Sequence, residues 1–247
     1  MNKLILLRHG QSQWNLENRF TGWKDVSLTP LGISEAKFSG EELLKNNLRV
    51  KSVYTSLLNR ATETADIVAG IINFPKNEIK YDWRLNERHY GALQGLNKSE
   101  TASEYGENQV KIWRRSYDIP PPLLDTDDER HPKFNDKFKH ILCELPVGES
   151  LKNVIDRIKP FWNKYVNDII QSKGDHLIVA HSNSLRAIVK ILDQLSDKEI
   201  ISVNIPTGVP LVYTLDHSLN VLKKEYLIDD EKLKKKQEIV ANQGKIK

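Results

Sequence analysis

Two histidines occupy matching places in the sequence, each directly after a short apolar run. Residues 4–7 lead into Arg8-His9-Gly10, and residues 177–180 lead into His181-Ser182-Asn183. Short apolar runs are typical of buried strands, and open α/β sheets bind ligands beyond the carboxyl ends of their strands. One histidine after a strand is more often structural. Two in the same setting predict that both imidazoles reach a single crevice, if the two strands are neighbours.

The residues near these histidines favour a phosphoryl group over a metal ion. Arg8 adjoins His9, Ser12 and Asn15 offer short polar side chains, and Arg60 opens a predicted helix. Guanidinium groups match phosphate oxygens bidentately, and backbone N–H groups at helix starts favour anions. The spacing of paired zinc-binding histidines is absent from the sequence, as are the glycine-rich phosphate loops and the serine hydrolase elbow. We therefore expect an anion site without a metal.

The composition excludes several other classes of protein. The 247 residues are 39% hydrophobic, enough to bury a sizeable core, and include a single cysteine, Cys143. One cysteine cannot form an internal disulfide, a thiol redox pair or a zinc finger. Only residues 4–7 separate Lys3 from Arg8, too few for a secretory segment, and no apolar run approaches the roughly 20 residues of a spanning helix. We expect a cytoplasmic protein that does not bind membranes.

The positive charge is concentrated at the C-terminus. The formal net charge is +4, yet residues 232–247 alone contain six lysines and one acidic residue, Glu238. The rest of the chain is therefore close to neutral, which argues against nucleic-acid binding. Composition alone favours a solvated, frayed terminus. The alternative is a mobile tail that covers an anionic pocket.

Strand and helix patterns alternate along the chain. Strands are predicted near residues 3–7, 50–54, 79–81, 177–180, 211–215 and 220–224, with apolar residues at helical spacing between most of them. Such alternation predicts a three-layer α/β fold, with a mainly parallel β-sheet flanked by helices on both faces. We expect a single catalytic domain, residues 1–231, followed by the lysine-rich tail, residues 232–247.

One long stretch breaks this alternation. Residues 86–148 are polar and contain Pro120-Pro121-Pro122 and a charged run at 125–130. Long irregular segments of this kind are usually functional or mobile. The segment is predicted to be an insertion of short helices and loops laid over the active site.

Several motifs, taken together, resemble one family. Residues 6–15, Leu-Leu-Arg-His-Gly-Gln-Ser-Gln-Trp-Asn, resemble the signature of the histidine phosphatase superfamily. Further motifs follow in order at residues 18–23, 55–61, 87–98, 113–117 and 180–186, and they look like those of its cofactor-dependent phosphoglycerate mutase family. The resemblance extends over the whole chain, down to residues 240–245.

The resemblance implies a phosphohistidine mechanism. His9 resembles the nucleophile, and Arg8, Arg60 and His181 would hold the transferring phosphoryl group. Asn15 and the backbone of Ser182 and Asn183 would complete that cradle. Glu87 resembles the general acid/base on the substrate hydroxyl, although the residues alone favour a surface ion pair between Glu87 and Arg88.

The resemblance also implies a substrate clamp. Tyr90, Lys98, Arg114 and Arg115 look like the residues that hold the substrate carboxylate and distal phosphate. Thr21 and Gly22 look like substrate-loop contacts, and Ser12 belongs to the same predicted binding set. The sequence departs from the family at Ser182, where the family usually has glycine, so the binding geometry is expected to shift slightly.

The activity implied is the interconversion of 2-phosphoglycerate and 3-phosphoglycerate in glycolysis and gluconeogenesis. It would be primed by 2,3-bisphosphoglycerate, would need no metal, and would reside in a cytoplasmic homodimer or homotetramer. The alternative is a broad phosphomonoester phosphatase of the same superfamily, which passes the phosphoryl group to water. An anion-binding protein without catalytic activity is a third hypothesis, but both histidines and Glu87 argue against it.

Overall fold

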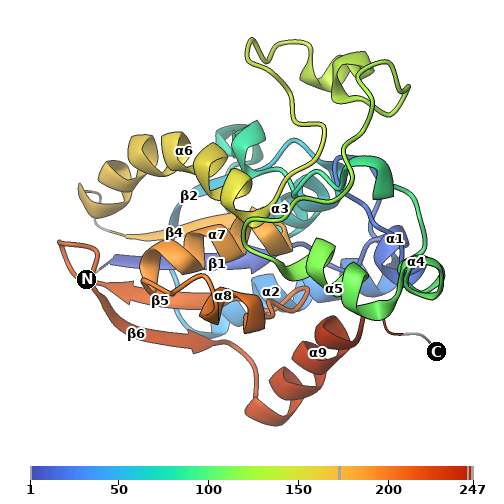
Figure 1. The fold of residues 1–247 in the computed structure, drawn as a ribbon. Helices are drawn as coiled ribbons and strands as arrows, with labels where there is room; N and C mark the ends of the chain where they lie inside the picture. Colours follow the sequence, from blue (N-terminus) through green and yellow to red (C-terminus); the bar gives the residue numbers. More distant parts are fainter. Residues whose placement is uncertain (1, 172–173, 244, 246–247) are drawn as a thin grey trace.

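The computed structural model describes residues 2–171, 174–243 and 245, and these residues contain a six-stranded central sheet (Figure 1). The strands are β1 (Asn2–Arg8), β2 (Val50–Thr55), β3 (Lys80–Tyr81), β4 (Asp175–Ala180), β5 (Leu211–Leu215) and β6 (Val221–Tyr226). Their order is β3-β2-β4-β1-β5-β6. Neighbours from β3 to β1 run parallel, whereas β5 is antiparallel to both β1 and β6. The predicted mainly parallel sheet is confirmed.

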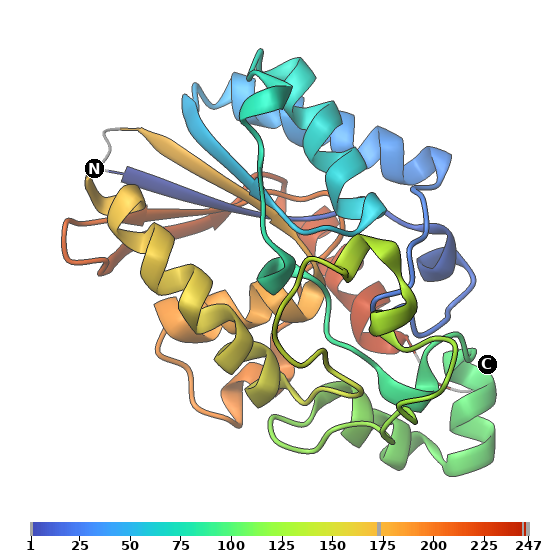
Figure 2. The ribbon, with the colours of Figure 1, turned by 90° about the horizontal axis from the view of Figure 1, so that it is seen from above.

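Helices cover both faces of this sheet. On one face, Leu4 and Leu6 of β1 pack in a core with α6 (Leu151–Gln171) and α7 (Ser182–Leu192). On the other, Ile5 and Leu7 pack with α2 (Pro30–Lys45) and α3 (Asn59–Ile71). Alternate residues of a strand point to opposite faces, so a strand buried on both sides is apolar throughout. Figure 2 shows the three layers that the sequence predicts.

The register of β1 against β4 places the two histidine segments side by side. Arg8 lies opposite Ala180, and the N–H of His9 donates to the Ala180 carbonyl at 3.0 Å. Parallel strands end at the same edge of a sheet, so the residues that follow β1 and β4 must meet there. The expectation that these strands are neighbours is confirmed.

Residues 86–148 fold as short helices joined by long loops. These helices are η3 (Gly91–Leu93), α4 (Lys98–Tyr105), α5 (Glu107–Arg115), η4 (Pro132–Phe134) and η5 (Asp136–Phe138). α4 and α5 lie at the carboxyl edge of the sheet, whereas the chain between α5 and α6 forms a lobe that projects from it (Figure 1). In this lobe Lys137 contacts Asp25, and the Phe138 ring lies 4.9 Å from that of Trp23.

The remaining elements are short, apart from the last helix. They are α1 (Gln13–Leu16), η1 (Lys76–Glu78), η2 (Trp83–Leu85), α8 (Glu199–Ser202) and α9 (Asp230–Asn242). α9 contains most of the predicted tail and begins two residues before it, because Asp229 caps the helix by accepting the Lys232 N–H at 2.9 Å. Mobility of this tail stays a prediction. No helix in the described part of the chain is long and apolar enough to cross a membrane.

The loop after β1 packs directly on the first turn of α2. A Cβ at Gly32 would lie 2.1 Å from the Gln11 carbonyl oxygen, and a Cβ at Gly10 would lie 2.2 Å from the Gly32 oxygen. Backbone meets backbone at this contact, so neither glycine has room for a side chain. The position of the histidine loop therefore depends on both residues.

We predict that Gly32→Ala lowers the free energy of unfolding by about 1–3 kcal/mol, as overpacking of a dense interior does. Gly70→Ala is the matched control, because the atom nearest to its Cβ would be Lys76 Cε at 4.0 Å. Alanine there should be neutral or stabilise α3 by up to about 1 kcal/mol. Urea denaturation measures both variants. Equal stability of the two would contradict the close contact.

Candidate active site

The two imidazoles that follow β1 and β4 are in contact. The ring centroids of His9 and His181 lie 4.9 Å apart in an edge-to-face arrangement. Both side chains are buried, and His9 lines the cavity whereas His181 is not among its described lining residues. His181 Nε2 forms a 2.7 Å hydrogen bond with the Ser56 hydroxyl at the end of β2. The strand order therefore converts two distant motifs into one histidine pair.

Hydrogen bonds fix the tautomer of His9. Its Nδ1 lies 2.7 Å from the Gly10 carbonyl oxygen, which can only accept, so Nδ1 carries the proton. Nε2 is then left as an acceptor, and Arg60 Nε donates to it at 3.3 Å. Burial, with Arg60 and Arg8 nearby, holds the pKa of His9 well below its usual 6.5. A neutral imidazole with an unprotonated Nε2 is the form that can act as a nucleophile, once the phosphoryl group takes the place of the Arg60 donor.

Arg60 is held by backbone carbonyls from the loop after α1. Its Nη2 donates to the Gly22 oxygen at 2.9 Å and its Nη1 to the Lys24 oxygen at 3.1 Å. Gly22 has φ of +55°, which favours glycine, and it does not line the cavity. Burial lowers the pKa of Arg60 to about 10, so the group keeps its charge at neutral pH. Gly22 thus positions Arg60.

The helix after His181 begins at the departure from the family pattern. Ser182 is the first residue of α7 and lines the cavity. It is not among the described residues with positive φ. A right-handed helical residue does not need the conformational freedom of glycine. Serine is therefore accommodated here without backbone strain.

The Glu87 carboxylate lies against the N-terminus of α7. Its Oε1 accepts the Asn183 N–H at 3.1 Å and the Arg88 N–H at 2.8 Å, so the Asn183 N–H is occupied by this carboxylate. Glu87 is only 7% exposed. The Arg88 guanidinium turns elsewhere and donates to the Arg114 carbonyl at 2.7 Å. The interpretation of Glu87 as one partner of a surface ion pair is wrong.

The backbone of Glu87 is held by residues that the sequence analysis missed. Its carbonyl accepts from Trp23 Nε1 at 2.6 Å and from Arg157 Nη2 at 3.2 Å. Arg157, on α6, also pairs with Glu149 at 2.7 Å, and both side chains are almost fully buried. The available signal is its position three residues after Val154, which places a charge within the apolar stripe of α6.

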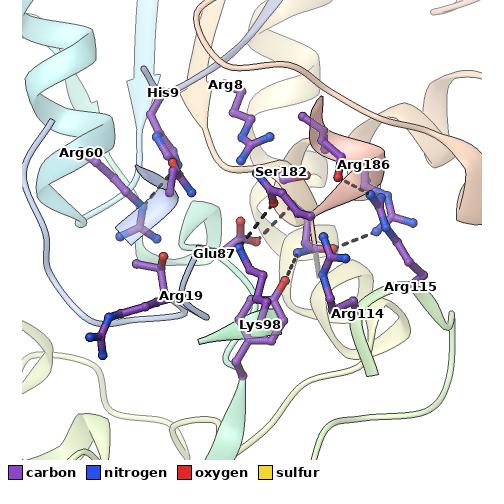
Figure 3. Close-up of a pocket in the computed structure, with 16 residues that line it drawn as sticks. Arg8, His9, Arg19, Arg60, Glu87, Lys98, Arg114, Arg115, Ser182 and Arg186 are labelled. Atoms are coloured by element: carbon purple, nitrogen blue, oxygen red, sulfur yellow. Dashed lines mark hydrogen bonds between the residues drawn. The ribbon is translucent and has the colours of Figure 1, made fainter. Parts of the chain in front are cut away.

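One cavity collects the charged side chains at this edge of the sheet. Its described lining residues are Arg8, His9, Asn15, Arg19, Thr21, Arg60, Glu87, Tyr90, Lys98, Arg114, Arg115, Ser182, Asn183, Arg186, Val240 and Gln243. Among them, seven arginines and lysines face a single carboxylate. Figure 3 shows His9 with Arg60 on one side, Arg114 with Arg115 on the other, and Glu87 between them. We call the part of the cavity with His9, Arg8 and Arg60 the His9 end, and the part with Lys98, Arg114 and Arg115 the distal end.

Burial and mutual repulsion destabilise the charged forms of the cations at the distal end. Burial and the neighbouring Arg114 hold the pKa of Lys98 well below its usual 10.5. Burial and Arg115 lower the pKa of Arg114 to about 10. Desolvation and like charges both disfavour the charged form of a lysine or arginine. A bound polyanion would stabilise the charged forms of Lys98 and Arg114. The cavity therefore suits a ligand with negative charge at each end.

Most of the predicted site residues line this cavity, and the exceptions are Ser12, Gly22 and His181. Ser12 caps α1, since its hydroxyl accepts the Asn15 N–H at 3.3 Å while Asn15 Oδ1 accepts the Ser12 N–H at 3.1 Å. The sequence predicts Ser12 as a binding residue, but its side chain is used to cap α1. The roles of all the predicted site residues toward a substrate stay predictions.

Four lining residues were not predicted: Arg19, Arg186, Val240 and Gln243. Arg186 donates to Asn183 Oδ1 at 2.9 Å and to the Ile200 carbonyl at 2.7 Å, and burial with Arg115 lowers its pKa to about 9. Its place four residues after Ser182 puts both on one face of α7, a signal that was available. Nothing in the sequence alone brings Val240 and Gln243 to the cavity.

The tail reaches the cavity without its lysines. Lys232 and Lys235 pair with acidic residues at the start of α9, and Lys236 pairs with Glu35. None of the described tail lysines lines the cavity, and Lys247 lies outside the described residues. The tail therefore lines the cavity through Val240 and Gln243 and not through the lysines that the structure describes. That the tail covers a bound anion stays a prediction.

Within the described residues, no group of three or more histidine, cysteine, aspartate or glutamate side chains is arranged to hold a metal ion.

Comparison with known proteins agrees with this geometry. Residues 4–225 match the histidine phosphatase superfamily, branch 1. The chain is 51% identical over 246 residues to a 2,3-bisphosphoglycerate-dependent phosphoglycerate mutase of Hydrogenobaculum sp. (strain Y04AAS1), covering 99% of this chain and 100% of that one. A protein of the same name from Borreliella burgdorferi (strain ZS7) is 50% identical over 248 residues, covering both chains completely. This chain belongs to the histidine phosphatase superfamily.

Solved structures of more distant members share the histidine phosphatase fold. A mycobacterial glucosyl-3-phosphoglycerate phosphatase in complex with VO3 superimposes with a TM-score of 0.70 at 22% identity, covering 91% of this chain and 98% of that one. Bacillus stearothermophilus YhfR gives 0.67 at 23% identity, covering 90% and 94%. At these identities the likeness establishes the fold alone.

The buried histidines predict a pH-dependent stability. Burial holds the pKa values of His9 and His181 well below 6.5 and lowers that of His89 to about 3. The unfolded chain therefore binds more protons below pH 6.5 than the folded chain does, and the free energy of unfolding falls as the pH falls. Each such histidine costs up to about 1.4 kcal/mol per pH unit below 6.5.

We expect a lower free energy of unfolding at pH 5.5 than at pH 7.5, measured by urea denaturation. His9→Gln should reduce this difference, whereas the exposed His217→Gln should leave it unchanged. The same loss in His9→Gln as in the wild type would contradict a neutral, buried His9.

Proposed function

We propose that this chain interconverts 2-phosphoglycerate and 3-phosphoglycerate in glycolysis and gluconeogenesis, with 2,3-bisphosphoglycerate as the priming phosphoryl donor. The full-length identity of about 50% to proteins of that name supports this activity. The observation that carries the proposal is the cavity itself, in which an unprotonated imidazole nitrogen lies beside one group of cations and a second group lies opposite. Each phosphoglycerate carries two anionic groups, a carboxylate and a phosphate, so both groups of cations have a partner.

Phosphoryl transfer begins at His9. Its Nε2 attacks the phosphorus of the donor, and the bond from phosphorus to the ester oxygen breaks as the new N–P bond forms. The charge on the equatorial oxygens is met by Arg8 and Arg60, as this kind of transition state requires. Glu87, protonated for this step, gives its proton to the departing ester oxygen, which leaves as a hydroxyl group.

The second half runs the same chemistry in reverse. An incoming monophosphate, whose free hydroxyl is on the other carbon atom, attacks the phosphohistidine, Glu87 takes the hydroxyl proton, and His9 returns to its neutral form. The monophosphate released in the first half and the one consumed in the second differ in the carbon that carries the phosphate, so the two halves together amount to the isomerisation. Atoms and charge balance over the cycle, and the donor is regenerated.

The distal end distinguishes a mutase from a phosphatase. Lys98, Arg114 and Arg115, with Tyr90, would hold the carboxylate and the second phosphate while the bisphosphate intermediate reorients in the cavity. Thr21, Asn15 and Ser182 also line the cavity and offer polar groups. A phosphatase needs only the His9 end and access for water. The second group of cations therefore supports the mutase over the broad phosphatase.

We predict a covalent phosphoryl adduct after mixing with 2,3-bisphosphoglycerate, detected as an increase in intact mass. His9→Ala should give no adduct and almost no turnover while remaining folded, because the only proposed nucleophile is gone. His217→Ala, at an exposed histidine, should keep the adduct. An adduct on His9→Ala would refute the assignment of the nucleophile.

We predict that Glu87→Gln lowers kcat by about 10²–10⁴, the usual contribution of general acid–base catalysis, with a smaller change in KM. Glutamine keeps the shape of the side chain and an oxygen that can accept the Asn183 N–H. Steady-state kinetics measures both constants. A near-normal kcat would leave Glu87 with a structural role at the start of α7.

We propose that the reaction needs no metal ion, because Arg8, Arg60 and the distal cations already supply the positive charge that a metal would. Activity should survive treatment with a chelator in full. Loss of activity with EDTA and its recovery with a divalent ion would overturn this. A cytoplasmic location, a homodimer or homotetramer and the absence of nucleic-acid and membrane partners stay predictions.

A further inference from the structure

A buried carboxylate joins three distant segments beside the active site. Glu35, on α2, is 8% exposed. Its Oε2 accepts the Gln11 N–H at 2.7 Å, and its Oε1 accepts from the Thr207 hydroxyl at 2.9 Å and from Lys236 Nζ at 2.6 Å. The contacted segments are the loop after β1, the loop before β5 and helix α9. The mechanism described above does not use Glu35.

The contact with the first loop reaches His9 through a single peptide group. The Gly10 carbonyl and the Gln11 N–H belong to the same planar unit, and they point to opposite sides of it. His9 Nδ1 donates to that carbonyl at 2.7 Å, and Glu35 accepts from that N–H at 2.7 Å. A carboxylate on the N–H side strengthens the carbonyl as an acceptor, because linked hydrogen bonds polarise one another. Glu35 thereby supports the tautomer in which Nδ1 carries the proton and Nε2 is unprotonated.

The contact with α9 reaches the distal end of the cavity. Lys236 and Val240 are four residues apart and share one face of α9, and Gln243 follows directly after the last residue of the helix. The Val240 carbonyl accepts from Arg115 Nη2 at 3.3 Å, and Gln243 Oε1 accepts from Lys98 Nζ at 3.4 Å. The ion pair of Lys236 with Glu35 therefore fixes the helical face that lines the cavity.

We propose that Glu35 and Lys236 are positioning residues for the phosphoryl transfer. Through one ion pair they couple the docking of α9 on the cavity to the orientation of the His9 imidazole. The inference rests on the proposed mutase function. Docked α9 excludes water from the phosphohistidine, and the same carboxylate holds the peptide that orients the nucleophile. Loss of the pair should both slow transfer to the substrate and speed hydrolysis of the phosphohistidine.

The test compares two lysines of the same helix. Lys236→Met removes the ion pair, and Lys235→Met is the matched control, because the partner of Lys235 among the described residues is the exposed Glu231 on its own helix. Each phosphoenzyme is formed with 2,3-bisphosphoglycerate and freed of excess donor. The decay of the adduct is then followed by intact mass, and kcat and KM are measured in parallel.

We expect Lys236→Met to lose its adduct several-fold faster than the wild type and to lose up to about 100-fold in kcat, the scale of a misplaced reacting group. Lys235→Met should match the wild type, and Lys236→Arg should restore both rates. Equal behaviour of Lys236→Met and the wild type would overturn the proposal. So would equal effects of the two methionine variants, since charge rather than the ion pair would then be responsible.

A second variant, Glu35→Gln, tests the link from Glu35 to His9 by a measurement made at the imidazole itself. In Glu35→Gln, the Nδ1–H resonance of His9 should shift, because the carboxylate no longer polarises the peptide. An unchanged resonance would overturn the link to His9. A wild type that forms no adduct would refute the proposed function itself, which is a different outcome from wild-type decay in Lys236→Met.

Discussion

The parallel pairing of β1 with β4 is the constraint on which the rest of the site depends. Its register sets Arg8 opposite Ala180, so His9 and His181 emerge together and their rings meet at 4.9 Å. Both strands are buried on two faces, and a slip of one residue would exchange their two faces. Packing of the core therefore determines the geometry of the nucleophile, although the apolar residues 4–7 and 177–180 do not line the cavity.

Three buried arginines of the cavity, Arg8, Arg60 and Arg186, donate to backbone oxygens that carry no net charge. Arg8 donates to the Ile205 carbonyl at 2.8 Å, Arg60 to the Gly22 carbonyl and Arg186 to the Ile200 carbonyl. Arg157, behind the site, is instead neutralised by Glu149. Carbonyl acceptors fix a guanidinium without cancelling its charge, so the attraction remains available to an anion. The cost of burying these cations is met by the packing of the surrounding domain.

The sequence predicts the parts of this site that are local. Apolar runs followed by His9 and His181 indicate both the strands and the crevice, and family motifs indicate the cations. The tail could be predicted as a cover for the pocket, but Val240 and Gln243 could not be singled out within it, because the docking of α9 decides which tail residues reach the cavity. Ser12 has a suitable side chain, yet capping of α1 turns it away. Sequence patterns specify residue types and strands, whereas side-chain direction and distant contacts require the folded chain.

In the proposed mechanism the fold presents one particular nitrogen, His9 Nε2, to the phosphoryl group. This can be tested by NMR of the imidazole nitrogens in ¹⁵N-histidine-labelled protein after mixing with 2,3-bisphosphoglycerate. We expect phosphorus coupling at His9 Nε2, while Nδ1 keeps its proton and its hydrogen bond to the Gly10 carbonyl. Phosphorus bound to Nδ1, or to another histidine, would contradict it.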